Sequence, residues 1–208
     1  TGLCIALKDV GFKRYPRVDS LLLSGLSSLY PGLLLLGYIL LTQEIPPLRG
    51  NYLWALLISG SINTAAFAMY MVALRSSDLS VTMPMLAFTP LFMLVTSPII
   101  LGEYPGPLGL LGILLIVFGS YVLNLSRRDE GLLGPFKALF QDTGPKLMFT
   151  VAFIWSISAN IDKIGIQGSS PLFWISSLFI FIGCNLCLLS WLRLKQDFRP
   201  QLSTALGA

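Results

Sequence analysis

The sequence predicts an all-α membrane protein, built as a polytopic bundle of hydrophobic helices. Hydrophobic residues make up 54% of the 208 residues and charged residues only 12%, whereas soluble domains carry about 25% charged residues. A chain with so few charges cannot cover a globular surface that faces water. The sequence also contains long stretches without any charge, and a helix needs about 20 apolar residues to cross a bilayer. Composition and stretch length therefore indicate the same fold class.

The uncharged stretches predict the individual spans in order. They are residues 20–42, 51–74, 79–102, 105–126, 147–161 and 171–192. Residues 1–7 are too few to cross a bilayer and predict the end of a helix that begins before the sequence. Residues 201–208 predict the approach to a further helix. We therefore expect a fragment, cut at both ends, with about six spans and a partial one.

The connections between the spans are short, with one exception. Residues 75–78 and 103–107 contain the charged residues, glycine and prolines of tight turns. Residues 127–146 are longer and polar, so we expect them to be a linker. Apolar residues in this segment have helical spacing, so both a helix lying flat on the membrane and a plain linker fit the pattern.

The composition argues against several kinds of chemistry. The sequence has no histidine, which removes the most common general base, metal ligand and pH switch. Cys184 and Cys187 have CxxC spacing, but they lie in an apolar stretch and are expected to be packing thiols. The sequence also lacks the motifs of serine and aspartic intramembrane proteases. We therefore expect no enzyme, no metal and no cofactor.

The basic residues indicate how the chain crosses the membrane. The pI of about 9.1 would suit a nucleic-acid binder, but the lysines and arginines lie between the apolar stretches, where membrane proteins keep them. When the loops are assigned alternately to two sides, Arg49 and Lys163 lie on one side and all other Lys and Arg residues on the other. The positive-inside rule places the second side in the cytoplasm. No nucleic-acid partner is expected.

Two short segments, residues 6–12 and 160–166, resemble each other. Each has a pair of opposite charges, an aliphatic residue and a glycine, and a proline-bearing loop follows each of them. An odd number of predicted helices separates equivalent points, so the two copies would cross the membrane in opposite senses. Inverted repeats are typical of transporters, which hold their substrate near the interface of the repeats.

Several motifs in residues 21–125 occur in the order and spacing of a known family. With the partial helix at residues 1–7 counted as the first, the third predicted helix (residues 51–74) ends in Ala73-Leu74. The fourth (residues 79–102) contains Thr89-Pro90-Leu91-Phe92 and leads into Leu101-Gly102-Glu103, and the fifth (residues 105–126) contains Gly109-Leu110-Leu111-Gly112. These motifs resemble those of the EamA-like transporters in the drug/metabolite transporter superfamily.

The resemblance implies the architecture of the complete protein, which would have two inverted five-helix repeats. Residues 1–126 would be the first repeat without most of its first helix, residues 127–146 the linker, and residues 147–208 the start of the second repeat without its last three helices. Family members are usually drawn with both termini in the cytoplasm. That drawing opposes the orientation that the basic residues predict, so the orientation stays open.

A first set of candidate substrate-path residues lies in the fourth predicted helix. Thr82, Thr89 and Thr96 recur every seven residues, close to two helical turns, so they would share one face. Prolines in the same span free backbone carbonyls, which are tolerated at membrane depth where they line a cavity. The alternative is that the threonine hydroxyls bond to their own helix. Both interpretations fit the spacing.

A second set lies in the helix after the linker. Ser156, Asn160 and Lys163 are spaced i, i+4 and i+7 beside Trp155. Polar residues in a span face protein or water rather than lipid, so this stripe is the best candidate for substrate contact. The alternative for Asp162 and Lys163 is that they lie near the helix end and extend to the membrane surface.

The third predicted helix and the carboxylates complete the candidates. Asn63 and Tyr70 are polar candidates on the third helix, where small residues such as Ser59 are expected to pack against other helices. Asp9 and Asp162 are the carboxylates expected inside the bundle, and proton coupling would need such a group. Small multidrug-resistance relatives place a key glutamate in the first helix, which this sequence mostly lacks.

The predicted function is transmembrane transport of a small organic metabolite or drug by alternating access, as efflux or exchange. The expected location is a plasma membrane of the bacterial inner-membrane type. The expected partners are the lipid bilayer, a small-molecule substrate and a proton or another coupling ion, and a homodimer is compatible with the sequence. The alternative is a structural or signalling membrane protein. The inverted repeat favours transport because a two-state carrier uses it.

Overall fold

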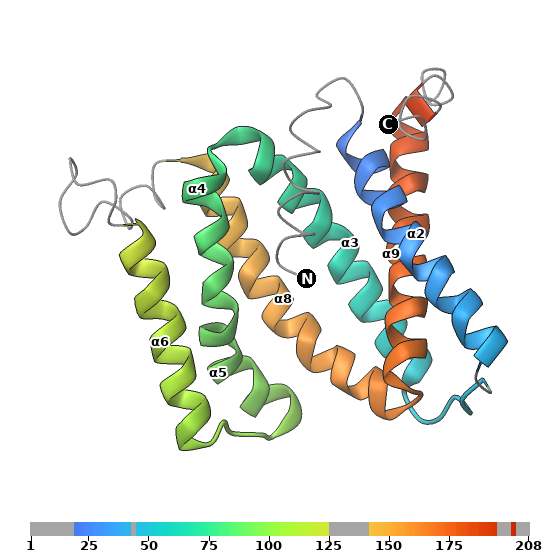
Figure 1. Ribbon diagram of the computed structural model, residues 1–208, viewed down its shortest axis with the longest axis horizontal. Helices are drawn as coiled ribbons and strands as arrows, with labels where there is room; N and C mark the ends of the chain where they lie inside the picture. Colours follow the sequence, from blue (N-terminus) through green and yellow to red (C-terminus); the bar gives the residue numbers. More distant parts are fainter. Residues whose placement is uncertain (1–18, 43–44, 125–141, 195–200, 203–208) are drawn as a thin grey trace. The chain divides into compact units, whose positions relative to one another are not determined.

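A computed structural model describes residues 19–42, 45–124, 142–194 and 201–202, and all its regular elements in these ranges are helices (Figure 1). The helices are α2 (Ser20–Thr42), α3 (Tyr52–Ser76), α4 (Leu79–Thr82), the 3-10 helix η1 (Met83–Phe88), α5 (Thr89–Leu101), α6 (Pro107–Asn124), α8 (Thr143–Gln167) and α9 (Pro171–Leu194). The prediction of an all-α polytopic bundle is confirmed.

Five helical segments within the described residues are long and apolar enough to cross a membrane. They are Ser20–Thr42, Tyr52–Ser76, Met83–Leu101, Thr143–Gln167 and Pro171–Leu194. The remaining predicted span, residues 105–126, corresponds to α6. Its apolar stretch of described side chains, Pro107–Ile116, is shorter than the five candidate spans. The predicted helix end in residues 1–7, the first copy of the repeat in residues 6–12 and most of the linker lie outside the described residues.

The helix after the linker is longer than predicted. The uncharged stretch predicted residues 147–161, whereas α8 begins at Thr143 and continues through Asp162 and Lys163 to Gln167. The charged pair therefore lies inside the helix, more than one turn before its end, and does not terminate it.

The chain divides into two compact units, and the division falls within α3 and within α8. The first unit contains residues Thr1–Met71 and Asp162–Ala208, and the second contains Val72–Ile161. Each unit has its own packing, which the following paragraphs describe separately.

In the first unit, α2 and α9 lie side by side (Figure 1). Glycines allow their backbones to approach closely. A Cβ atom added to Gly183 would lie 2.8 Å from the backbone nitrogen of Leu29 and 2.9 Å from the carbonyl oxygen of Gly25. The Ser176 hydroxyl donates a hydrogen bond across the pair to the carbonyl oxygen of Gly32 at 2.9 Å. Small residues and interhelical hydrogen bonds are the usual basis of helix association in lipid.

The end of α8 packs against the start of α9 in the same unit. Gly165 leaves room for the ring of Trp174, which is buried. The Tyr52 ring meets Trp174 edge to face, with ring centroids 5.5 Å apart. Arg49 donates its backbone N–H to the carbonyl oxygen of Gly168 at 2.9 Å. These contacts connect the segment before α3 with the turn between α8 and α9.

Asp19 connects the start of α2 to α9. Its Oδ1 atom accepts hydrogen bonds from the backbone N–H groups of Leu21 at 2.9 Å and Leu22 at 3.1 Å, so Asp19 is an N-cap. The same oxygen accepts a bond from the Ser190 hydroxyl at 3.0 Å. Arg193 lies 3.8 Å from Oδ2 and its side chain is 70% exposed, so this ion pair adds little.

Replacing Asp19 with alanine is expected to lower the free energy of unfolding by about 2 kcal/mol, because the change removes a helix cap and leaves the Ser190 hydroxyl without its acceptor. Asp78 provides a matched control, since it precedes α4 without any side-chain cap hydrogen bond and is exposed. Asp78→Ala should change the free energy by less than about 0.5 kcal/mol. Unfolding in mixed detergent micelles measures both, and equal effects would contradict the capping role.

In the second unit, the fourth predicted helix is not continuous. It consists of α4, η1 and α5. Pro84 and Pro90 each stand near the start of a new segment, because proline has no N–H to donate to the preceding turn. The backbone N–H of Thr89 donates to the carbonyl oxygen of Leu86, three residues back, which is the 3-10 pattern. The predicted span over residues 79–102 is therefore helical but divided into three segments.

Aromatic side chains hold η1 and α5 against α8 within this unit. The Phe88 ring meets Phe149 at a centroid distance of 5.4 Å, and the Phe92 ring meets Phe149 at 5.0 Å and Phe153 at 5.3 Å, all edge to face. Such pairs contribute about 0.5–1.5 kcal/mol each beyond their buried area.

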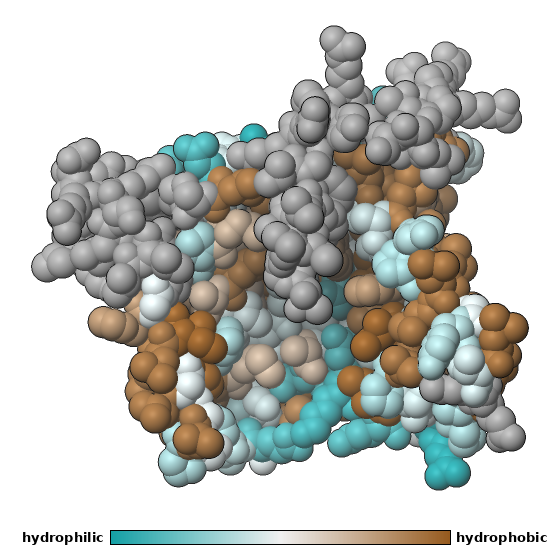
Figure 2. Space-filling view, in the orientation of Figure 1, coloured by the Kyte–Doolittle hydropathy of each residue, from teal (hydrophilic) through white to brown (hydrophobic). Residues whose placement is uncertain are grey.

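Much of the apolar surface faces outward. Between 11% and 44% of the residues in the apolar windows of the five candidate spans are buried, so most of the others must face another apolar medium. Figure 2 shows hydrophobic side chains in brown over α6 and over α2 and α9. On α6, the exposed large side chains include Leu108, Leu111, Leu114, Leu115 and Phe118. Lipid is the medium that such surfaces match.

Candidate functional site

A chain of hydrogen bonds in the first unit ends on Asp162. Asn63 on α3 donates from Nδ2 to the hydroxyl oxygen of Ser59 at 3.1 Å and to the carbonyl oxygen of Ser59 at 3.0 Å. The Ser59 hydroxyl in turn donates to Oδ1 of Asp162 on α8. Ser59 and Asn63 are buried and Asp162 is half-buried. The Asn63 amide and the Ser59 hydroxyl are thus linked in series to the carboxylate of Asp162.

The depth of Asp162 makes its position notable. It lies five residues before the end of α8 at Gln167, about 7–8 Å along the helix axis. Its partner Ser59 lies seven residues after the start of α3 at Tyr52, about 10 Å along that axis. Ionisable residues inside spans are rare and usually mark substrate or ion pathways. Asp162 is therefore a candidate functional residue.

A second polar contact joins α5 to α8 within the second unit. Asn160 donates from Nδ2 to the hydroxyl oxygen of Thr96 at 3.0 Å and to the carbonyl oxygen of Ser156 at 2.7 Å. The Thr96 hydroxyl has two acceptors within reach, the carbonyl oxygens of Phe92 at 3.2 Å and of Ser156 at 3.3 Å. We call Thr96, Ser156 and Asn160 the amide clasp. All three residues are buried.

The other half of the Asn160 amide has no partner. Its Oδ1 atom is buried and accepts no hydrogen bond from the described residues. The residue as a whole is only 1% exposed. The assignment of the two amide atoms is fixed by chemistry, because the carbonyl oxygen of Ser156 can only accept and must face the NH₂ group. An unsatisfied buried acceptor costs about 1–3 kcal/mol. The clasp therefore holds a carbonyl oxygen that requires a donor.

The structure brings some predicted candidates together and leaves others apart. Thr96, Ser156 and Asn160 meet in the amide clasp. The Thr82 hydroxyl bonds to the carbonyl oxygen of its own turn at Asp78, at 2.8 Å, which is the alternative role considered for the threonines. Thr89 is half-buried at the start of α5.

The turns of η1 also change the predicted threonine face. A 3-10 helix advances about 120° per residue and an α-helix about 100°. Seven-residue spacing therefore keeps Thr89 and Thr96 on one face of α5, but it does not place Thr82 on that face. The prediction that all three share a face is wrong for Thr82.

The remaining candidates have the following positions. Tyr70 is buried on α3, with its ring 6.4 Å from that of Phe67. Trp155 and Lys163 are half-buried on α8. Asp9 lies outside the described residues.

Sequence reasoning missed the role of Ser59, which had been assigned to helix packing. The signal was present in part, since Ser59 and Asn63 are spaced i, i+4 and so share a helix face. Sequence reasoning also missed Trp174, which is buried with its Nε1 atom unpartnered among the described residues.

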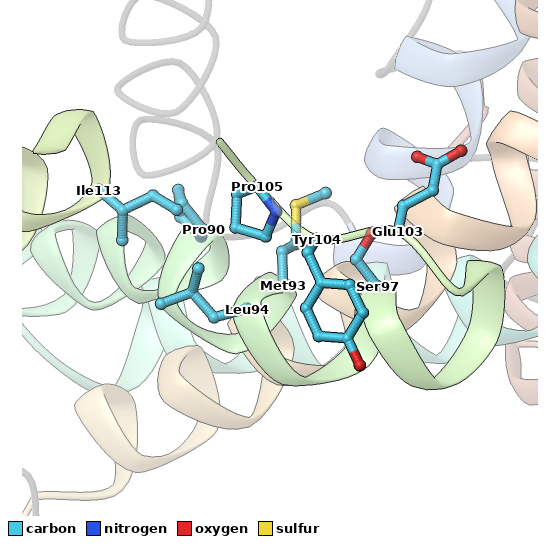
Figure 3. A pocket seen from close by; sticks show the side chains of 8 residues that line it. All are labelled: Pro90, Met93, Leu94, Ser97, Glu103, Tyr104, Pro105 and Ile113. Carbon is cyan, nitrogen blue, oxygen red and sulfur yellow. The ribbon is translucent and has the colours of Figure 1, made fainter. Parts of the chain in front are cut away.

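A pocket of about 220 Å³ lies in the second unit at the connection between α5 and α6 (Figure 3). Its lining is Pro90, Met93, Leu94, Ser97, Glu103, Tyr104, Pro105 and Ile113. In Figure 3, the Glu103 carboxylate and the Tyr104 ring extend in opposite directions. Gly102 ends α5 with a φ of +69°, the left-handed conformation that favours glycine, and so sets the direction of this connection. The pocket contains none of the predicted site residues.

Within the described residues, no group of three or more His, Cys, Asp and Glu side chains is placed to hold a metal ion. Cys184 is exposed and Cys187 half-buried, both as free thiols.

Apolar helices of spanning length, joined by buried hydrogen bonds between polar side chains, define an integral polytopic membrane protein. The sequence profile of the EamA-like transporter family matches residues 1–125, more than half of the chain. The chain therefore belongs to the EamA-like transporter family, as the motifs in residues 21–125 had predicted. Neither the curated proteins nor the solved structures compared with the chain gave a match.

Proposed function

We propose that the protein moves a small organic metabolite or drug across the membrane by alternating access. The observation that carries this proposal is the match to a transporter family over residues 1–125. Transporters of inverted-repeat architecture bind their substrate near the bilayer midplane. Efflux or exchange as the mode of transport, a bacterial inner membrane as its location, coupling to protons or another ion, and a homodimer belong to the same proposal, by analogy with the family.

Two groups of buried polar side chains support the proposal. The first is the series from Asn63 through Ser59 to Asp162, and the second is the amide clasp around Asn160. Polar and charged groups in a span have a free-energy cost, so those that persist generally line a pathway or a binding site. A passive membrane anchor has no need of a half-buried carboxylate in a span.

The test is a flux assay with the complete gene product in proteoliposomes. A panel of labelled metabolites that includes amino acids, amines and neutral aromatic compounds is offered with and without an imposed proton gradient. Movement driven by the gradient would support a proton-coupled carrier, and movement independent of it a uniporter or exchanger. Failure to move any compound, in vesicles where the protein is folded and inserted, would overturn the proposal in favour of a structural or signalling role.

A further inference from the structure

The amide of Asn160 carries more hydrogen-bonding capacity than the contact between α5 and α8 uses. Its NH₂ group makes the bonds to Thr96 and Ser156, and its carbonyl oxygen makes none among the described residues. The bond to Ser156 lies within α8 and the bond to Thr96 joins α8 to α5, so the NH₂ group accounts for the contact between the helices. The carbonyl oxygen takes no part in that contact and remains to be explained.

From this surplus, and resting on the proposed transport function, we infer that Oδ1 of Asn160 accepts a hydrogen bond from the transported molecule. The substrates of this site then carry an N–H or O–H donor. The direction follows from the geometry, because the carbonyl oxygen of Ser156 lies 2.7 Å from Nδ2 and holds the amide in one orientation. An anionic group without a hydrogen would meet only a carbonyl oxygen at this point.

The donor could come from two sources, a transported solute or a trapped water molecule. Both supply the same chemistry to Oδ1, since a buried amide oxygen is satisfied equally by water. They differ in their consequence for transport. A solute that binds Oδ1 loses affinity when the oxygen is removed, whereas a trapped water leaves solute affinity unchanged.

The chain offers a matched pair of variants that separates these cases. Asn160→Leu removes Oδ1 together with the contact to Thr96. Thr96→Val removes the same interhelical contact but leaves the Asn160 amide in place. Asn160→Ser is a milder second variant, which keeps a donor for the carbonyl oxygen of Ser156 and lacks the amide oxygen. Thermal unfolding in detergent confirms that each variant is folded before its transport is measured.

The experiment measures flux by the complete gene product in proteoliposomes with pairs of probes that differ in their donors. The pairs are glycine and trimethylglycine, methylammonium and tetramethylammonium, and indole and 1-methylindole. We expect wild type to move the donor-bearing member of at least one pair and to discriminate against its methylated partner at least tenfold. For that donor-bearing probe, Asn160→Leu and Asn160→Ser should raise KM about tenfold or more, and both should raise it more than Thr96→Val does, because only they remove the carbonyl oxygen.

The outcomes separate this inference from the proposed function. Wild type that moves methylated and donor-bearing probes equally, or moves only solutes without a donor, overturns the inference and leaves transport established. Equal KM values in the Asn160 variants and in Thr96→Val overturn it as well, and assign Oδ1 to a trapped water. Wild type that moves no solute at all overturns the proposed function itself.

Discussion

Replacing Gly183 with alanine is expected to lower the free energy of unfolding by about 3 kcal/mol, the upper part of the range for overpacking. The added methyl group would lie 2.5 Å from Cγ of Leu29, 2.8 Å from its backbone nitrogen and 2.9 Å from the carbonyl oxygen of Gly25. Two of these three atoms belong to the backbone, so rotating a side chain cannot relieve the overlap. The two helices must therefore move apart, and the close contact between α2 and α9 is lost.

Gly37 is the matched control for this change. It also lies in α2, but a Cβ atom added to it would meet nothing within 4 Å. Gly37→Ala should therefore leave the protein as stable as wild type or slightly more stable, because alanine has the higher helix propensity. Unfolding of both variants in mixed detergent micelles measures the difference. If Gly183→Ala and Gly37→Ala had the same free energy of unfolding, the contact between α2 and α9 would not be tight.

The second large effect is expected at Asp162. Asp162→Asn keeps an oxygen that can accept the Ser59 hydrogen bond and removes the negative charge. If the carboxylate takes part in transport, the initial rate in proteoliposomes should fall at least tenfold, while the thermal unfolding temperature stays close to that of wild type. The physical reason is that an amide cannot bind and release a cation or a proton as a carboxylate does.

Asp78→Asn controls for the loss of one negative charge. Asp78 is exposed, at the turn between α3 and α4, so its neutralisation should leave the transport rate within about twofold of wild type. A normal rate in Asp162→Asn would assign this carboxylate a structural role in joining α3 to α8. A loss of rate in both variants would indicate that the overall charge matters rather than a specific site.

The spans were largely predictable because apolar stretch length is a property of the sequence alone. The errors in the spans have local causes. The charges of Asp162 and Lys163 were taken to end the apolar stretch, whereas α8 continues past them to Gln167. The Ser59 hydroxyl, on another helix, donates a hydrogen bond to the Asp162 carboxylate. Charge and hydropathy along one stretch of sequence cannot predict a partner on a different helix.

The candidate site was predictable only in part. Spacing along each helix nominated Thr96 and Asn160 separately, but it could not show that they form one contact, because 64 positions separate them in the chain. In the same way, Ser59 was assigned to packing since its partner Asp162 lies 103 positions away. Spacing rules describe which residues share a face of one helix, and these contacts depend on how different helices meet.

The short 3-10 helix also affects how well its span fits a bilayer. A 3-10 helix rises about 2.0 Å per residue, and an α-helix about 1.5 Å. Met83–Leu101 contains 19 residues, of which the 6 in η1 are 3-10. The segment is therefore about 31 Å long, compared with about 28 Å if it were α-helical throughout. The six residues of η1 therefore add about 3 Å to this span, a length comparable to the differences in thickness between one membrane and another.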